Sequence, residues 1–215
     1  FIKIIMIIWM ARYYEVHAKR LGSWFISSLP LMVGAVITFL IVIQPDLGTA
    51  IIFALLVGCI FLSVPIPKRV KRNIILFVIL IILGVAVVLL LSGKSFLQSR
   101  QLERFDFTNP CDRLLDTGNQ VCNGYIAINN GGLTGIGLGN STQKYLYLPY
   151  PYTDFIFAVI VEELGALVGV GLVLAYLYVL YRIIKIGKAS YTNRGAIICY
   201  GVAAYIFIHI AVNLM

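Results

Sequence analysis

The chain has 215 residues, of which 60% are hydrophobic and 12% are charged, and its formal net charge at pH 7 is +8. A soluble domain of this length cannot bury so much apolar side chain, so the composition excludes an ordinary soluble globular protein. The mean hydropathy of +0.94 leads to the same conclusion. We therefore expect an all-α, polytopic transmembrane protein that forms one membrane domain over residues 1–215.

In chain order, hydropathy predicts helices separated by polar breaks. Residues 1–14 are too few to cross a bilayer, which takes about 20 residues, so we expect them to be part of a longer helix and the chain to begin within a longer protein. Its end, inside an apolar run, suggests the same. Spans are predicted at 23–43, 48–64, 73–92, 155–181 and 195–215. The polar segment 93–154 is then a long loop within the membrane domain.

The distribution of charge predicts the orientation of these spans. Three short connectors, at 12–20, 68–72 and 182–194, hold 11 of the 17 Lys and Arg residues, whereas the long loop carries five bases and five acids. By the positive-inside rule the connectors face the cytoplasm and the loop lies outside. The excess of positive charge thus indicates topology and contact with anionic lipid, and no nucleic-acid partner is needed to explain it.

The four cysteines give weaker signals. Cys59 and Cys199 fall within predicted spans, where they act as small apolar side chains. Cys111 and Cys122 share the outer loop, where a disulfide is one alternative and two free thiols the other. None of the four has the spacing of a metal site.

A glycine-rich segment lies in the second half of the loop. Gly132, Gly135, Gly137 and Gly139 read GxxGxGxG, which is neither the dinucleotide fingerprint nor a Walker loop. We interpret them as a tight turn that folds back over helix ends. Residues 120–130, before this turn, are expected to form a short helix in the membrane interface.

Acidic residues near or within the spans are the candidates for chemistry. Asp154 stands where the polar loop enters an apolar helix, so it could act as a base or, with Thr153, simply cap that helix. In a continuous helix Glu162 and Glu163 would lie about 12 Å below Asp154, where each should face a cavity or a basic partner.

A second set of polar residues lies in the first half of the chain. Lys3 is an isolated base in one helix, and Asp46 follows Gln44 at the break after the span 23–43. Because an unpaired charge is costly in lipid, we expect Lys3 and Asp46 to pair.

Two long motifs resemble those of a known family. GYIAINNGGLTGIGLGNSTQKYLYLP with TDFIFAVIVEELG, and QPDLGTA at residues 44–50, are similar to the signatures of the SEDS family (shape, elongation, division and sporulation). The GLGNSTQK wording, which includes Asn140 and Ser141, is more similar to the cell-division and sporulation members than to the elongation member. Members usually have about ten spans, so the chain looks like the central part of one.

The resemblance implies a peptidoglycan glycosyltransferase in the bacterial cytoplasmic membrane, serving cell division or cell shape. It would polymerise lipid II, a disaccharide-pentapeptide on undecaprenyl pyrophosphate, at the outer face, together with a class B penicillin-binding protein. The essential acid of the family's TDF motif falls on Asp154, which would act as the base. Lys144 and Arg104 are the candidate diphosphate ligands, and a divalent cation could share that role.

One departure from the family pattern keeps other functions open. The family usually has Glu after the Leu-Pro of the loop, whereas Tyr150 follows Leu148 and Pro149 here, and a tyrosine supplies no carboxylate at neutral pH. A non-catalytic scaffold that activates its penicillin-binding partner is therefore one alternative. A lipid II flippase, with Asp46, Glu162 and Glu163 as a proton relay, is the other.

Overall fold

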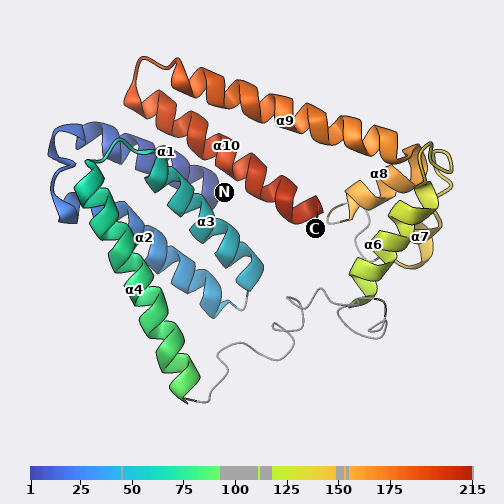
Figure 1. Cartoon of the computed structure of the whole chain (residues 1–215), viewed down its shortest axis with the longest axis horizontal. Helices are drawn as coiled ribbons and strands as arrows, with labels where there is room; N and C mark the ends of the chain where they lie inside the picture. The colour runs from blue at the N-terminus through green and yellow to red at the C-terminus, as the bar shows by residue number, and fades with distance from the viewer. Residues whose placement is uncertain (45, 93–110, 112–117, 149–152, 154, 215) are drawn as a thin grey trace. The chain divides into compact units, whose positions relative to one another are not determined.

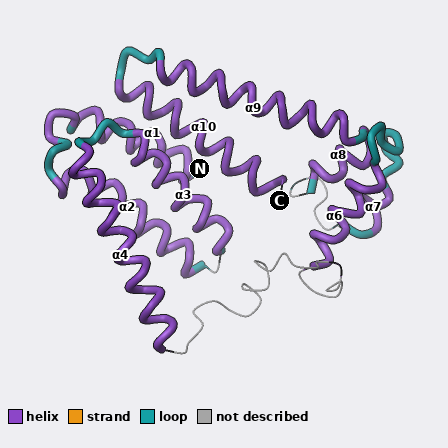
Figure 2. Tube along the Cα trace, viewed as in Figure 1, coloured by secondary structure: helices purple, strands orange, loops and turns teal. Residues whose placement is uncertain are grey.

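The regular elements of the chain are helices, as the sequence predicts (Figures 1 and 2). The computed structural model describes residues 1–44, 46–92, 111, 118–148, 153 and 155–214. The α-helices are α1 Ile2–Val16, α2 Trp24–Ile43, α3 Leu47–Ser63, α4 Lys68–Ser92, α6 Gly118–Gly131, α7 Thr142–Leu146, α8 Ile156–Leu164, α9 Ala166–Lys188 and α10 Asn193–Leu214, and a short 3-10 helix covers Ala18–Arg20.

The helices fall into two compact units, which we describe one at a time. The first contains residues 1–94 and 179–211, and the second contains residues 95–178 and 212–215. In the described residues, α2, α9 and α10 are long and apolar enough to cross a membrane, and α3 is a shorter apolar helix. The spans predicted at 23–43, 48–64 and 195–215 thus correspond to α2, α3 and α10. The chain is a membrane protein.

The core of the first unit lies where α1, α3 and α10 meet. Met10 of α1 and Phe53 and Ile60 of α3 are completely buried, and Ile197 of α10 packs into the same cluster. Gly201 lets α10 approach closely, because a Cβ there would lie 2.7 Å from Ile7 Cγ2 and 3.4 Å from Ile60 Cγ1. Close packing therefore holds these helices together where they do not face lipid.

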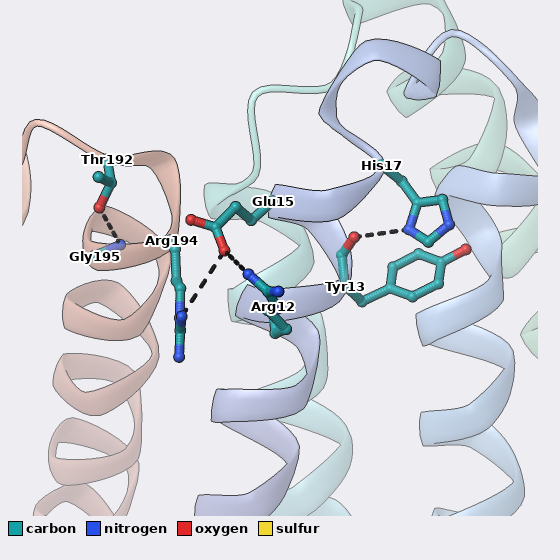
Figure 3. A network of polar contacts seen from close by, with 7 residues as sticks. All are labelled: Arg12, Tyr13, Glu15, His17, Thr192, Arg194 and Gly195. Carbon is teal, nitrogen blue, oxygen red and sulfur yellow. Dashed lines mark hydrogen bonds and ion pairs between the residues drawn. The ribbon is translucent and has the colours of Figure 1, made fainter.

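At one end of this unit, α1 and α10 share a polar contact (Figure 3). The Glu15 carboxylate lies 2.8 Å from Arg12 Nη1 and 3.9 Å from Arg194 Nη1. The start of α10 is closed by Thr192, whose hydroxyl accepts a hydrogen bond of 3.1 Å from the Gly195 N–H. One partly exposed acid thus links two of the three basic connectors.

The connector between α3 and α4 is fixed in a different way. Lys71, in the first turn of α4, donates hydrogen bonds to the carbonyl oxygens of Leu62 (2.7 Å) and Val64 (2.9 Å). These carbonyls belong to the end of α3, where the helix leaves such groups without partners of its own. The ammonium also complements the negative end of the helix dipole.

Candidate functional site

The second unit breaks the predicted span 155–181 into two helices. α8 ends at Leu164, Gly165 adopts a positive φ of 89°, and α9 begins at Ala166. At 1.5 Å per residue the 23 residues of α9 reach about 34 Å, enough to cross the hydrocarbon layer without α8. The expectation that Glu162 and Glu163 lie inside a continuous span is therefore wrong, because both precede the break and lie beyond the N-terminal end of α9.

The glycine-rich segment forms a turn that wraps around this break. Within the glycine turn, residues 132–140, the Ile136 N–H donates to the Glu162 carbonyl and the Gly137 N–H to the Glu163 carbonyl, both at 3.0 Å. A Cβ at Gly135 would lie 2.3 Å from the Glu163 carbonyl oxygen, so a larger residue there would displace the backbone. This confirms that the glycines fold the loop over helix ends. The two N–H groups donate to protein carbonyls, whereas in a phosphate-binding loop such groups point at the ligand.

Glu162 is the buried centre of the site. Its carboxylate accepts hydrogen bonds from the Ser141 hydroxyl, from Thr142 Oγ1 at 3.3 Å and from Asn130 Nδ2 at 3.5 Å, and its side chain is fully buried. All three donors are neutral. Charge-assisted hydrogen bonds of this kind compensate for the loss of water around a buried carboxylate. Glu162 thus joins α8 to α6 and to the start of α7 (Figure 1).

Glu163 has a basic partner, as expected from the sequence. Its Oε1 atom lies 3.5 Å from Lys144 Nζ, and the two side chains are 11% and 16% exposed. Lys144 is placed by α7, whose N-cap is Ser141: the Ser141 Oγ accepts a hydrogen bond of 3.1 Å from the Lys144 N–H. Ser141 therefore contacts both the Glu162 carboxylate and α7, the helix that carries Lys144.

Asn140 has a local structural contact. Its side-chain amide donates to the Ile136 carbonyl at 3.1 Å, which closes the glycine turn. The matched motif thus includes one residue that shapes the turn, Asn140, and one that joins the turn to α8, Ser141.

A disulfide between Cys111 and Cys122 anchors the loop to α6. The two Cα atoms are 5.0 Å apart, and Cys122 is buried. This decides the alternative that the sequence left open. The expected short helix at residues 120–130 is also confirmed, as α6.

The polar residues of the first unit have other partners than expected. Lys3 Nζ lies 3.2 Å from His209 Nε2 on α10, and the other ring nitrogen of His209 lies 2.8 Å from the Tyr205 carbonyl. Asp46 caps α3 by accepting a hydrogen bond of 3.1 Å from the Thr49 N–H. The predicted pairing of Lys3 with Asp46 is therefore corrected to a contact between Lys3 and His209. Gln44 is the exposed C-cap residue of α2.

Sequence reasoning missed three of the residues in these contacts. His209 was overlooked because a neutral imidazole does not stand out as a partner in a search for opposite charges. Asn130 precedes a glycine, and Thr142 lies within the GLGNSTQK motif. No periodic pattern in the sequence indicates that either side chain contacts Glu162. In the described part of the chain, no group of three His, Cys, Asp or Glu side chains could hold a metal ion.

Comparison with known proteins identifies the family. The sequence model of the cell cycle proteins FtsW, RodA and SpoVE matches residues 1–215. The chain belongs to this family. It is 35% identical over its full length to the probable peptidoglycan glycosyltransferase FtsW of Bacillus subtilis, of which it covers 54%. It is 34% identical to the protein of the same name from Dichelobacter nodosus, over 100% of this chain and 53% of that one. It is 33% identical to stage V sporulation protein E of B. subtilis, over 100% of this chain and 57% of that one.

The chain spans about half the length of these FtsW-like relatives. Three predicted positions, Asp154, Arg104 and Tyr150, lie outside the described residues. Next to Asp154, the N-cap residue of α8 is Phe155, which makes no side-chain capping hydrogen bond. The alternative in which Asp154 caps this helix also lies outside the described residues.

Proposed function

We propose that the chain is the central part of a peptidoglycan glycosyltransferase that polymerises lipid II at the outer face of the bacterial cytoplasmic membrane. The observation that carries the proposal is the family match over all 215 residues, with relatives named as probable peptidoglycan glycosyltransferases. The polar cluster at the N-terminal end of α9 supports it, because a pyrophosphate on a polyprenyl chain lies at the same boundary between lipid and water. The process served is cell division or cell shape.

In this proposal Asp154 is the general base. The 4-hydroxyl of the acceptor sugar gives its proton to the Asp154 carboxylate while its oxygen forms a bond to C1 of the donor sugar. The bond between C1 and the pyrophosphate oxygen breaks, and its electron pair leaves with undecaprenyl pyrophosphate. Lys144 and Arg104 stabilise the negative charge that develops on the leaving group, and a divalent cation could assist them.

The described residues have a positioning role in the same proposal. Glu162 holds the Ser141 side of the loop against α8, and Glu163 holds the Lys144 side chain. Both acids lie shortly after Asp154 in sequence. The cluster therefore fixes Lys144 relative to the helix that follows the proposed base, as a pre-organised site requires.

These contacts also bear on the flippase alternative. A proton relay through Glu162 and Glu163 would need carboxylates that exchange protons with water or with each other. Glu162 is instead fully buried among neutral donors, and Glu163 is 3.5 Å from a lysine. This favours a polymerase over a flippase. We further propose a class B penicillin-binding protein as the partner, with the loop 93–154 on the extracytoplasmic side.

The test is polymerisation of labelled lipid II by the full-length protein together with its penicillin-binding partner. We expect Asp154→Ala to abolish glycan chains, because the acceptor hydroxyl loses its base, with a rate loss of roughly 100-fold or more. Tyr150→Glu restores the family carboxylate and should retain or raise activity. Unchanged chain formation by Asp154→Ala would favour the scaffold alternative and remove Asp154 as the base.

A further inference from the structure

The part of the long loop that the structure describes is unusual in carrying almost no charge. Residues 118–143 contain no Lys, Arg, Asp or Glu, whereas the rest of the segment 93–154 contains ten. Charged side chains are common on surfaces that lie in water, whereas tyrosine and tryptophan are enriched where a protein meets the membrane interface. The uncharged stretch includes all of α6 and the glycine turn.

The glycine turn exposes large apolar side chains. Leu133 is 69% exposed and Leu138 is 75% exposed, and neither belongs to a helix. Two tyrosines on the helices that precede and follow the turn in sequence are also exposed, Tyr125 on α6 and Tyr145 on α7. Neighbouring apolar side chains on the surface indicate that something covers them.

Backbone hydrogen bonds place Leu133 next to a lipid-facing helix. The Leu133 carbonyl accepts from the Leu167 N–H at 3.4 Å, and the Gly132 carbonyl accepts from the Ala166 N–H at 2.9 Å. Leu167, in the first turn of α9, is itself exposed, and α9 is one of the helices long and apolar enough to span a membrane. Exposed Leu133 therefore lies beside exposed Leu167, at the start of a helix that is long and apolar enough to span a membrane.

We propose that the glycine turn is a membrane-binding element that inserts Leu133 and Leu138 into the bilayer leaflet at which α9 begins. Tyr125 and Tyr145 then lie at headgroup depth, where aromatic residues with a polar tip are favoured. The backbone carbonyls of Glu162 and Glu163 accept hydrogen bonds from the turn. Insertion of the turn into the bilayer therefore fixes the depth of the polar cluster at the lipid–water boundary. This proposal stands on the surface of the turn alone and does not depend on the proposed enzymatic activity.

Depth can be measured on the full-length protein in lipid nanodiscs. Spin labels are attached to single cysteines at Leu133 and Leu138, after Cys59 and Cys199 are replaced by alanine, and their collisions with oxygen and with a water-soluble nickel complex are compared. Val170, an exposed residue of α9, serves as the lipid reference, and Tyr191, fully exposed in a connector, as the aqueous reference. All four positions are exposed, so labels there should leave the fold intact.

We expect labels at positions 133 and 138 to collide with oxygen more than with the nickel complex, as at position 170, and the reverse at position 191. A water-like pattern at both leucine positions would overturn the proposal. So would shielding from both reagents, which would indicate that protein covers the turn. Because the nanodisc holds the protein without a penicillin-binding partner, a lipid-like result identifies the bilayer as the occupant.

Discussion

Glu162 is a buried acid of the second unit that accepts hydrogen bonds from three side chains. Glu162→Gln keeps the shape of the side chain but turns a donor toward groups that themselves donate, the Ser141 hydroxyl among them. We expect a loss of roughly 2 kcal/mol in unfolding free energy for the glutamine and roughly 3 kcal/mol for Glu162→Ala, which also leaves a cavity. Thermal unfolding in detergent measures both. Glu15→Gln, at a partly exposed acid in the first unit, is the control and should cost at most about 1 kcal/mol.

If Glu162→Ala unfolded at the temperature of the unchanged protein, the carboxylate would have no part in holding the loop to α8. The polymerisation rate should fall along with stability in the alanine variant, because Ser141 and α7 lose their attachment. A fall in rate without any loss of stability would instead point to a direct part in chemistry.

Lys144 has two roles to separate, the contact with Glu163 and the proposed contact with the diphosphate. Lys144→Met removes both, whereas Glu163→Gln removes only the first. We therefore expect Lys144→Met to lower kcat/KM for lipid II at least tenfold more than Glu163→Gln, since one stabilised charge on a leaving group contributes about 1.4 kcal/mol or more. In stability, the double variant should show a coupling of about 0.5 kcal/mol between the two side chains.

Equal losses of activity in the two single variants, with no further loss in the double variant, would show that Lys144 acts only through Glu163. Steady-state kinetics on the full-length complex decides between these outcomes. Lys144→Arg is a useful companion, because it keeps the charge and changes only the geometry of donation.

At the scale of single residues, the sequence predicts that a charged side chain needs a partner better than it predicts which residue the partner is. Glu163 was expected to face a cavity or a base, and its partner is a base, Lys144. Lys3 was expected to find an acid and instead contacts His209, whose imidazole can accept a hydrogen bond while uncharged. The rule that buried charges need partners is sound, but it does not say whether the partner is charged.

At the scale of elements, the break at Gly165 decides where the acids lie. A side chain at this position would meet the Leu133 carbonyl at 2.3 Å and the Gly135 nitrogen at 2.6 Å, in a backbone conformation that L-residues rarely adopt. Gly165→Ala should therefore cost roughly 3 kcal/mol or more and loosen the glycine turn. Gly171→Ala, in α9 with nothing within 4 Å, is the matched control and should be neutral or stabilising by up to about 1 kcal/mol.

Unfolding temperature and protease resistance of the loop measure this difference. A Gly165→Ala variant as resistant as Gly171→Ala would contradict the turn geometry. The sequence predicted the turn from its glycines but missed the break, because the apolar residues on both sides of Gly165 read as one hydrophobic run. Only the backbone hydrogen bonds that the turn makes to both helices reveal that the chain changes direction there.

At the scale of the whole molecule, hydropathy and charge predict most of the helices and their direction. Apolar runs of sufficient length gave α2, α3 and α10 closely, since lipid demands long helices with satisfied backbones. α4 begins at Lys68 rather than at residue 73, because basic side chains can extend a helix into the headgroup region. The contacts within the second unit could not be predicted in this way, because they join residues far apart in sequence.

The topology is the last prediction, and it rests on an imbalance of charge. The three connectors hold 11 bases, and Glu15 is the single acid between residues 12 and 20, 68 and 72, or 182 and 194. Moving so many cations across a membrane against the positive-inside bias is unfavourable, so we expect the connectors to remain in the cytoplasm. A single cysteine at Tyr191 should then react with a membrane-impermeant maleimide only after cells are permeabilised.

Gln120→Cys, at an exposed position near the start of α6 and outside the glycine turn, is the matched probe for the opposite side and should react in intact cells. Both variants are made with Cys59 and Cys199 replaced by alanine, while Cys111 and Cys122 do not react because they form a disulfide. Labelling at position 191 in intact cells, or labelling at position 120 only after permeabilisation, would contradict the orientation. In the proposed function, an outward loop would bring the cluster around Glu162 to the side of the membrane on which lipid II is polymerised.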